Sequence, residues 1–182
     1  MENPACIPFE RQHKEQAKSL LSGVLPVPLV RLSQRLEEAI DRDARLGLAH
    51  VAVYRQADQS ERVVGIILAH LETTTTSLET CCAMIYVDAL AVDGVFQGQR
   101  LGTRLLERVL VPSLSNGLRV REVYLHTPCH DNELIMFYRK RGFVPDGDVV
   151  ENYYPRRWVR PPHAIVMRWR PSETTTATPR AL

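Results

Sequence analysis

The chain of 182 residues lacks several features that would assign it to a class at once. No apolar run reaches the ~18 residues of a membrane span. The first residues, MENPACIPFERQHKEQ, have neither the basic start nor the apolar run of a signal peptide. Charge of one sign is not in excess, because 23 Lys and Arg face 21 Asp and Glu. This balance disfavours a protein held to nucleic acid mainly by electrostatics.

Cysteine is scarce and badly spaced for metal binding. The four cysteines are Cys6, Cys81, Cys82 and Cys129, and no two have CxxC spacing. Adjacent Cys81 and Cys82 are poorly placed to ligate one metal or to bridge each other. We therefore expect no metal, and reduced thiols in the cytoplasm, with the nucleus as an alternative.

What is present is the ordinary composition of a soluble globular domain, with 45% hydrophobic and 24% charged residues. The length predicts one domain, which we place at residues 1–170. The tail Pro171–Leu182, PSETTTATPRAL, has almost nothing apolar to bury, so we expect residues 171–182 to be disordered.

Hydrophobic periodicity predicts antiparallel strands followed by alternating strands and helices. We expect helices at 10–21, 29–42, 102–114 and 132–141, and strands at 48–55, 62–71, 84–92, 120–126 and 164–170. The run Thr73–Thr76 is expected to form a hairpin loop or a solvated strand end. This order predicts an α/β fold built on a mixed sheet.

The most informative stretch is Tyr86–Leu106, YVDALAVDGVFQGQRLGTRLL. In it a strand ends, the loop Gln97–Gly102 follows and a helix begins, so unpaired N–H groups and the positive end of a helix dipole meet. Such groups suit a phosphate or pyrophosphate, to which Arg100 adds a cation and Thr103 a hydroxyl. On spacing alone, a tight turn without a ligand stays open. The GxxxxGK(S/T) and GxGxxG nucleotide motifs are absent.

QGQRLG at Gln97–Gly102 resembles the acyl-CoA pyrophosphate loop of the GNAT acetyltransferase superfamily, R/Q-x-x-G-x-G/A, with Arg100 in place of the first glycine. LPVP at Leu25–Pro28 looks like the substrate loop of NatE-type catalytic subunits of N-terminal acetyltransferases. Three more segments occur in the order expected of these subunits: VYLHT at 123–127, FYRKRGF at 137–143 and ENYYPRR at 151–157. The resemblance spans roughly residues 25–170.

This resemblance implies a GNAT fold, a mixed central sheet with splayed parallel strands flanked by helices. It implies acetyl transfer from the cosubstrate acetyl-CoA to the free N-terminal amine of a protein or peptide, by direct attack in a ternary complex. No cysteine lies beside a plausible base in the matched motif, which disfavours a covalent intermediate. Two alternatives stay open: a GNAT acting on a lysine or a small amine, and a weakly catalytic CoA-binding subunit of a larger assembly.

The expected partners are protein N-termini, with an auxiliary subunit or the ribosome as further candidates. We expect no membrane and no sequence-specific nucleic acid among the partners.

The resemblance also implies roles for single residues. Tyr86 and His126 match the tyrosine and histidine that act through an ordered water, and a histidine suits a base because it titrates near neutral pH. Tyr138 matches a tyrosine near the CoA sulfur, which protonates the thiolate or holds the thioester. The residues expected to bind the cosubstrate are Leu90, Ala91, Val92, Gln97, Gly98, Gln99, Arg100, Leu101, Gly102, Thr103 and either Asp131 or Asn132.

The residues expected to bind the acceptor are Leu25, Pro26, Val27, Asp88, Tyr153 and Tyr154. Leu25 and Val27 imply an apolar pocket for an initiator methionine followed by a large residue. The two tyrosines either bond the peptide backbone or cap the sheet.

Asp88 departs from the apolar residue typical of the family at this position. Strand periodicity predicts Tyr86, Asp88 and Leu90 on one face. The Asp88 carboxylate then attracts the substrate ammonium, acts as an alternative base, or shifts the acceptor preference.

Overall fold

The computed structural model describes residues 3–24, 29–77, 80–156 and 159–172, without side chains at 29–31, 73–77 and 80–81. Its centre is a seven-stranded sheet in the order β1-β2-β3-β4-β5-β7-β6. The strands are β1 Ala5–Pro8, β2 Ala49–Arg55, β3 Glu61–Ser77, β4 Thr80–Val92, β5 Arg119–Pro128, β6 Val144–Val150 and β7 Ala164–Trp169. Among the described strands only β4 and β5 pair in parallel, so the predicted mixed α/β sheet is confirmed.

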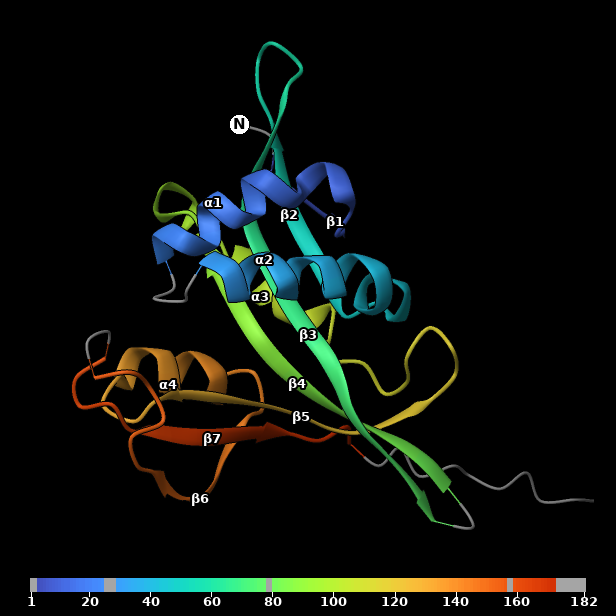
Figure 1. Ribbon diagram of the computed structural model, residues 1–182, viewed down its shortest axis with the longest axis vertical. Coiled ribbons are helices and arrows are strands. Elements are labelled where there is room, and N and C mark those ends of the chain that lie inside the picture. Colours follow the sequence, from blue (N-terminus) through green and yellow to red (C-terminus); the bar gives the residue numbers. More distant parts are fainter. Residues whose placement is uncertain (1–2, 25–28, 78–79, 157–158, 173–182) are drawn as a thin grey trace, which may run out of the picture.

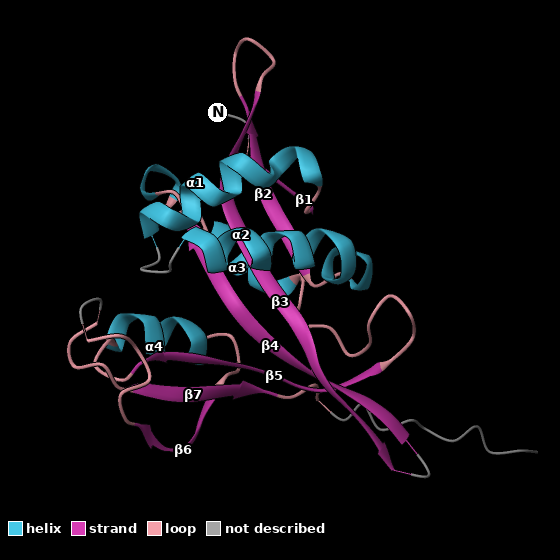
Figure 2. Cartoon of the chain, in the orientation of Figure 1, coloured by secondary structure: helices cyan, strands magenta, loops and turns pink. Residues whose placement is uncertain are grey.

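Helices cover both faces of the sheet (Figures 1 and 2). They are α1 Lys14–Val24, α2 Leu29–Glu38, α3 Leu101–Glu107 and α4 Asn132–Arg139. One core, under α1 and α2, contains Leu21 and Leu36, and the other, under α3 and α4, contains Leu105 and Tyr138. The α2 helix continues as a wider π turn, Ala39–Asp43, which makes up the rest of the predicted helix 29–42.

The two parallel strands part halfway along their length. The β4–β5 pairs run from Cys82–Arg119 to Tyr86–Tyr124 and end there. Beyond this point β4 continues toward α3, whereas β5 remains paired with β7 and leads to α4 (Figure 1). The splayed parallel strands expected from the sequence are therefore present, and Tyr86 lies at the point where they part.

The prediction that Tyr86, Asp88 and Leu90 share one face is wrong. The pairing of β3 with β4 shifts register at Asp88, which has no partner on β3. Such a bulge places two consecutive residues on one face. As a result both Val87 and Leu90 pack against the α3 core, although they are an odd number of residues apart. Tyr86 and Asp88 lie on the opposite face, which α2 covers.

Other elements differ from prediction at their ends. The helix expected at 102–114 ends at Glu107. Val111 precedes Pro112, and a residue before proline is held out of the helical region. Two strands were not predicted, β1 and the largely exposed β6, because neither alternates apolar with polar residues over its length. The threonine run belongs to the end of β3.

Two predicted segments fall outside the described residues: the substrate loop Leu25, Pro26 and Val27, and residues 173–182 of the predicted tail. Among the described residues, no helix is long and apolar enough to cross a membrane.

Gly65 is the tightest glycine of the sheet. A Cβ atom there would lie 2.9 Å from Leu105 Cδ1 and 3.3 Å from Ala52 Cβ, two residues that are fully buried. We expect Gly65→Ala to lower the free energy of unfolding by ~1–3 kcal/mol through overpacking. Gly23→Ala is the matched control, since a Cβ at Gly23 meets nothing within 4 Å and alanine favours the helix. Urea unfolding of the two variants measures both changes, and equal stabilities would contradict the prediction.

Candidate active site

Aromatic side chains gather where β4 and β5 part. This aromatic cluster consists of His70, Tyr86, Tyr124, His126 and Tyr153. The Tyr86 ring lies 5.6 Å from the ring of His70, 5.2 Å from Tyr124 and 5.7 Å from His126, measured between centroids. The Tyr86 hydroxyl bonds that of Tyr153 at 2.8 Å, and the Tyr153 ring stacks on His126 at 4.1 Å. The predicted pair Tyr86 and His126 is thus brought together, with Tyr153 over both.

His126 is hydrogen-bonded through its backbone, whereas its ring is held by stacking. Tyr154 donates its hydroxyl to the His126 carbonyl at 3.2 Å. The Nδ1 atom of His126 is buried and has no hydrogen-bond partner among the described residues. Burial, and secondly the charge of Arg168, lower the pKa of His126 below its ordinary value. The imidazole is therefore neutral at neutral pH, the state in which it can accept a proton.

The tyrosines of the site stay protonated. Burial and the hydrogen bond with Tyr153 raise the pKa of Tyr86 far above its ordinary value. Burial also raises the pKa of Tyr138, which lies in α4 with its ring against Phe137 and Phe143. Both hydroxyls are suited to donate hydrogen bonds and are poor bases.

The predicted CoA loop has the backbone geometry of an anion site. Gly98 and Arg100 both have positive φ, 76° and 60°, and Arg100 is the residue before α3. Arg104 is the first residue of this turn whose N–H bonds a backbone carbonyl, that of Arg100 at 3.0 Å. The N–H groups of residues 101–103 therefore have no backbone partner within the described chain. Loop and helix start together fit a pyrophosphate.

Arg141, which was not predicted, adds a cation beside this helix start. Its Nε donates to Thr103 Oγ1 at 3.0 Å and its Nη2 donates to the same oxygen, while its guanidinium lies 3.6 Å from the centre of the Phe137 ring. The Thr103 oxygen is thus already an acceptor for Arg141 and keeps only its hydrogen for a ligand. The FYRKRGF segment contains Arg141, but nothing in the pattern indicated which of its cations faces the loop.

Arg100 adopts a left-handed conformation that costs a non-glycine residue about 1 kcal/mol. We expect Arg100→Gly to raise the free energy of unfolding by up to ~1 kcal/mol, since glycine adopts positive φ without a steric penalty. Arg104→Gly, inside α3, is the opposite control and is expected to cost ~1 kcal/mol. Thermal unfolding measures both, and a less stable Arg100→Gly protein would disprove the strain.

The other residues predicted to bind the cosubstrate lie along the same path. Leu90, Ala91 and Val92 end β4, and the Val92 carbonyl accepts from the Gln97 side chain at 3.2 Å. Gln99 is exposed, and its side chain donates to the Val95 carbonyl. Leu101 is instead buried in the α3 core, so only its backbone is available to a ligand.

The start of α4 forms the other side of the parting strands. Asp131 caps this helix by accepting from the Leu134 N–H at 2.9 Å, whereas Asn132 is exposed. Thr127, on β5, is 1% exposed, and its hydroxyl has no partner among the described residues. A buried hydroxyl without a partner, beside the parted strands, is suited to hydrogen-bond an amide group in the arm of a CoA thioester. The residues present therefore fit acetyl-CoA, which supplies the activated acetyl group when bound.

The Asp88 carboxylate is already engaged in hydrogen bonds with two side chains of the protein. Its Oδ2 atom accepts from Arg35 Nη2 at 2.6 Å and from His70 Nδ1 at 2.8 Å. Arg35 also bonds Asp43, whose side chain is fully buried. Sequence reasoning missed Arg35 and His70. A signal for Arg35 existed, because it lies between Leu32 and Leu36 along the apolar stripe of its helix.

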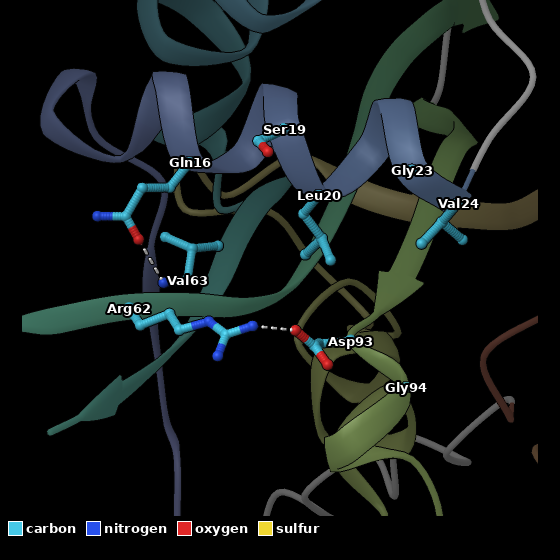
Figure 3. Close-up of a pocket in the computed structure, with 9 residues that line it drawn as sticks. All are labelled: Gln16, Ser19, Leu20, Gly23, Val24, Arg62, Val63, Asp93 and Gly94. Carbon is cyan, nitrogen blue, oxygen red and sulfur yellow. Dashed lines mark hydrogen bonds and ion pairs between the residues drawn. The ribbon is translucent and has the colours of Figure 1, made fainter.

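A cavity of ≈ 470 Å³ opens elsewhere, between α1 and the ends of β3 and β4 (Figure 3). Its walls are joined by an ion pair between Arg62 and Asp93 and by Gln16, which accepts from the Val63 N–H at 2.8 Å. None of the predicted site residues that the structure describes lines it. The described residues contain no group of three or more His, Cys, Asp or Glu suited to a metal ion.

The chain belongs to the GNAT acetyltransferases. Residues 47–145, more than half of its length, match the family model described as an acetyltransferase (GNAT) domain. This match contains the parting strands, the left-handed loop and α4. Comparison with curated protein sequences gives no match.

Solved structures share the fold over nearly the whole chain. One is Arabidopsis thaliana Naa50 in complex with the bisubstrate analogue CoA-Ac-MVNAL, with 22% identity, a TM-score of 0.65, and coverage of 92% of this chain and 98% of that one. Arabidopsis thaliana NAA60 in complex with a bisubstrate analogue has 17% identity and a TM-score of 0.71, and the match covers 92% of this chain and 99% of that one. The ribosomal-protein-S18-alanine N-acetyltransferase from Escherichia coli has 18% identity and a TM-score of 0.65, and the match covers 96% of this chain and 98% of that one.

Proposed function

We propose that this protein transfers the acetyl group of acetyl-CoA to the free N-terminal amine of a protein or peptide. The observation that carries the proposal is the pair Tyr86 and His126, 5.7 Å apart between ring centres at the point where β4 and β5 part. One strand leads from this point to the loop suited to a pyrophosphate, so a thioester held along that path ends beside a neutral imidazole.

The acceptor class is supported by the complexes of the similar structures. Naa50 was solved with CoA joined to the acetylated peptide MVNAL, and NAA60 with a bisubstrate analogue. Each of these structures aligns with 92% of this chain. We extend the N-terminal acceptor to this chain on that basis, with a single acetyltransferase domain over residues 1–170.

The residues divide the chemistry as follows. His126 accepts a proton from the amine nitrogen as the C–N bond forms. Tyr86 and Tyr138, kept protonated by burial, donate hydrogen bonds to the reacting group and to the departing sulfur. Tyr153 covers Tyr86 and His126 and therefore moves, or exchanges its bond with Tyr86 for one with the peptide, when an acceptor enters.

The test uses one peptide in four forms, with its α-amine free or blocked and with or without a lysine. Mass spectrometry of the products locates the acetyl group. We expect acetylation only at free α-amines, with a preference for Met-Leu over Ser-Gly starts. Acetylation of the blocked, lysine-containing peptide in preference to the free α-amine would replace the proposal with lysine or small-amine transfer.

A partner is part of the same proposal. NatB and NatC, whose structures also resemble this fold, are named as complexes. An auxiliary subunit or the ribosome would deliver the N-terminus to this chain. If the isolated chain binds acetyl-CoA but turns over no peptide, the weakly catalytic CoA-binding subunit is the correct alternative.

A further inference from the structure

A chain of charged groups leads from α2 to the aromatic cluster. Arg35 lies between two carboxylates, bonding Asp43 at 2.6 Å and Asp88 at 2.6 Å, and its Nη2 also donates to the Ala69 carbonyl. Its side chain is only 17% exposed, and that of Asp43 is fully buried. The Asp88 oxygen held in this way then accepts from His70 Nδ1 at 2.8 Å. The hydrogen bonds from Arg35 therefore fix the orientation of the Asp88 carboxylate.

This contact determines the tautomer of His70. An ionised carboxylate only accepts hydrogen bonds, so Nδ1 carries the hydrogen and Nε2 has the lone pair when the ring is neutral. Nε2 bonds no other described residue and is not among the buried polar atoms without a partner, so it remains accessible. An imidazole with a carboxylate behind one nitrogen and a lone pair on the other has the arrangement of an oriented general base.

His70 and His126 lie on either side of Tyr86 and differ in their support. Ring centres place His70 5.6 Å and His126 5.7 Å from Tyr86. His126 Nδ1 has no partner among the described residues, whereas His70 Nδ1 has a carboxylate. Of the two, His70 is the better oriented base.

An N-terminal amine has a pKa of about 7.7–8.0 and arrives largely as an ammonium at neutral pH. It loses two protons on becoming an amide, one before it attacks and one as the C–N bond forms. The site therefore needs two proton acceptors, or one that is used twice.

We propose that His70 is the base that removes the first of these protons, with Asp88 as its positioning residue. The inference rests on the proposed function. Nε2 of His70 takes a proton from the ammonium, directly or through one water, which leaves the neutral amine. The amine nitrogen then bonds the acetyl carbon as the carbon–sulfur bond breaks, the second proton passes to His126, and the thiolate takes up a proton. One proton in total is released to solvent.

Charged and titratable groups face His70 from several elements. They are Asp88 and Tyr86 from β4, with Arg35 from α2 and Asp43 from the π turn behind Asp88. Only Asp88 bonds the imidazole itself among the described residues.

The test measures kcat on a peptide with a free α-amine at pH 7.0 and at pH 9.5, for wild type, His70→Gln and Asp88→Asn. At pH 7.0 we expect both variants to lose at least ~10²-fold. At pH 9.5 the loss shrinks at least tenfold, because the amine has already lost its proton without help. His70→Ala is expected to regain activity when imidazole is added to the buffer. Each variant is first checked for its thermal shift with acetyl-CoA.

Asp58→Asn is the matched control, since Asp58 accepts from the Ser60 N–H and hydroxyl in the turn between β2 and β3 and bonds no residue of the aromatic cluster. It is expected to keep wild-type rates at both pH values. A loss in His70→Gln that is equal at both pH values, or no loss, or no imidazole rescue, overturns the role of His70. Should His70→Gln not fold, Asp88→Asn keeps the shape of the site and is judged by the same two rates.

The test also separates this inference from the proposed function. A wild-type protein that is active on α-amines, together with an unaffected His70→Gln, removes only the inference. A wild-type protein that acetylates no α-amine overturns both.

Discussion

Replacing His126 with alanine is expected to lower kcat on a free N-terminal peptide by ~10²–10⁴-fold at pH 7. The reason is that burial keeps this imidazole neutral, beside Tyr86 and on the strand that borders the parting of the sheet. Its proton comes from the nitrogen during bond formation, so this loss persists at pH 9.5, unlike the loss expected for His70 variants. Initial rates measured by mass spectrometry at the two pH values test the expectation.

His50→Gln provides the control. His50 is a strand histidine that, like His126, has a buried, unpartnered Nδ1 and a pKa lowered by burial, but it lies on β2 and bonds the Gly47 carbonyl. Its replacement is expected to lower the melting temperature and to leave kcat unchanged. The thermal shift caused by acetyl-CoA should remain in both variants. A His126→Ala protein that keeps more than about a third of the wild-type rate, far above the expected range, contradicts a role in proton transfer.

Local patterns were sufficient for most of the fold. The i, i+4 leucines of α2 and the apolar runs of β2, β3 and β4 depend on neighbours in the sequence, and periodicity detects those. The mixed sheet followed from the order of these elements. The edge strands β1 and β6 were missed because each pairs along one edge only and buries little. Neither needs the regular alternation that marks a half-buried strand.

The site was predictable only in part, for a different reason. Tyr86 and His126, quoted from motifs, lie together in the structure as the resemblance implied, and the loop 97–102 leads with a left-handed residue into α3. The bulge at Asp88 has no marker in the sequence, yet it reverses the face on which Leu90 lies. Contacts across 18 or 53 residues, such as Asp88 with His70 and with Arg35, depend on that register. Strand periodicity assumes a constant register and therefore could not predict them.

The arginine that holds this network should also be the most costly charge to remove. Arg35→Met is expected to lower the free energy of unfolding by ~3–5 kcal/mol, because it takes the cation from a fully buried Asp43 and from Asp88 together. Arg42 still reaches Asp43 at 3.1 Å, but its own side chain is 57% exposed, so it compensates only in part. Urea unfolding, with midpoint and slope both fitted, measures the change.

Two further variants decide whether charge is the cause. Arg55→Met removes an arginine from an exposed pair with Glu61, and it is expected to cost less than ~1 kcal/mol. Adding Asp43→Asn and Asp88→Asn to Arg35→Met should restore part of the lost stability, since the unpaired carboxylates are then neutral. A triple variant no more stable than Arg35→Met would assign the loss to packing of the arginine stem instead. The same triple variant lacks the carboxylate behind His70, so it should stay slow at pH 7 even where its stability is recovered.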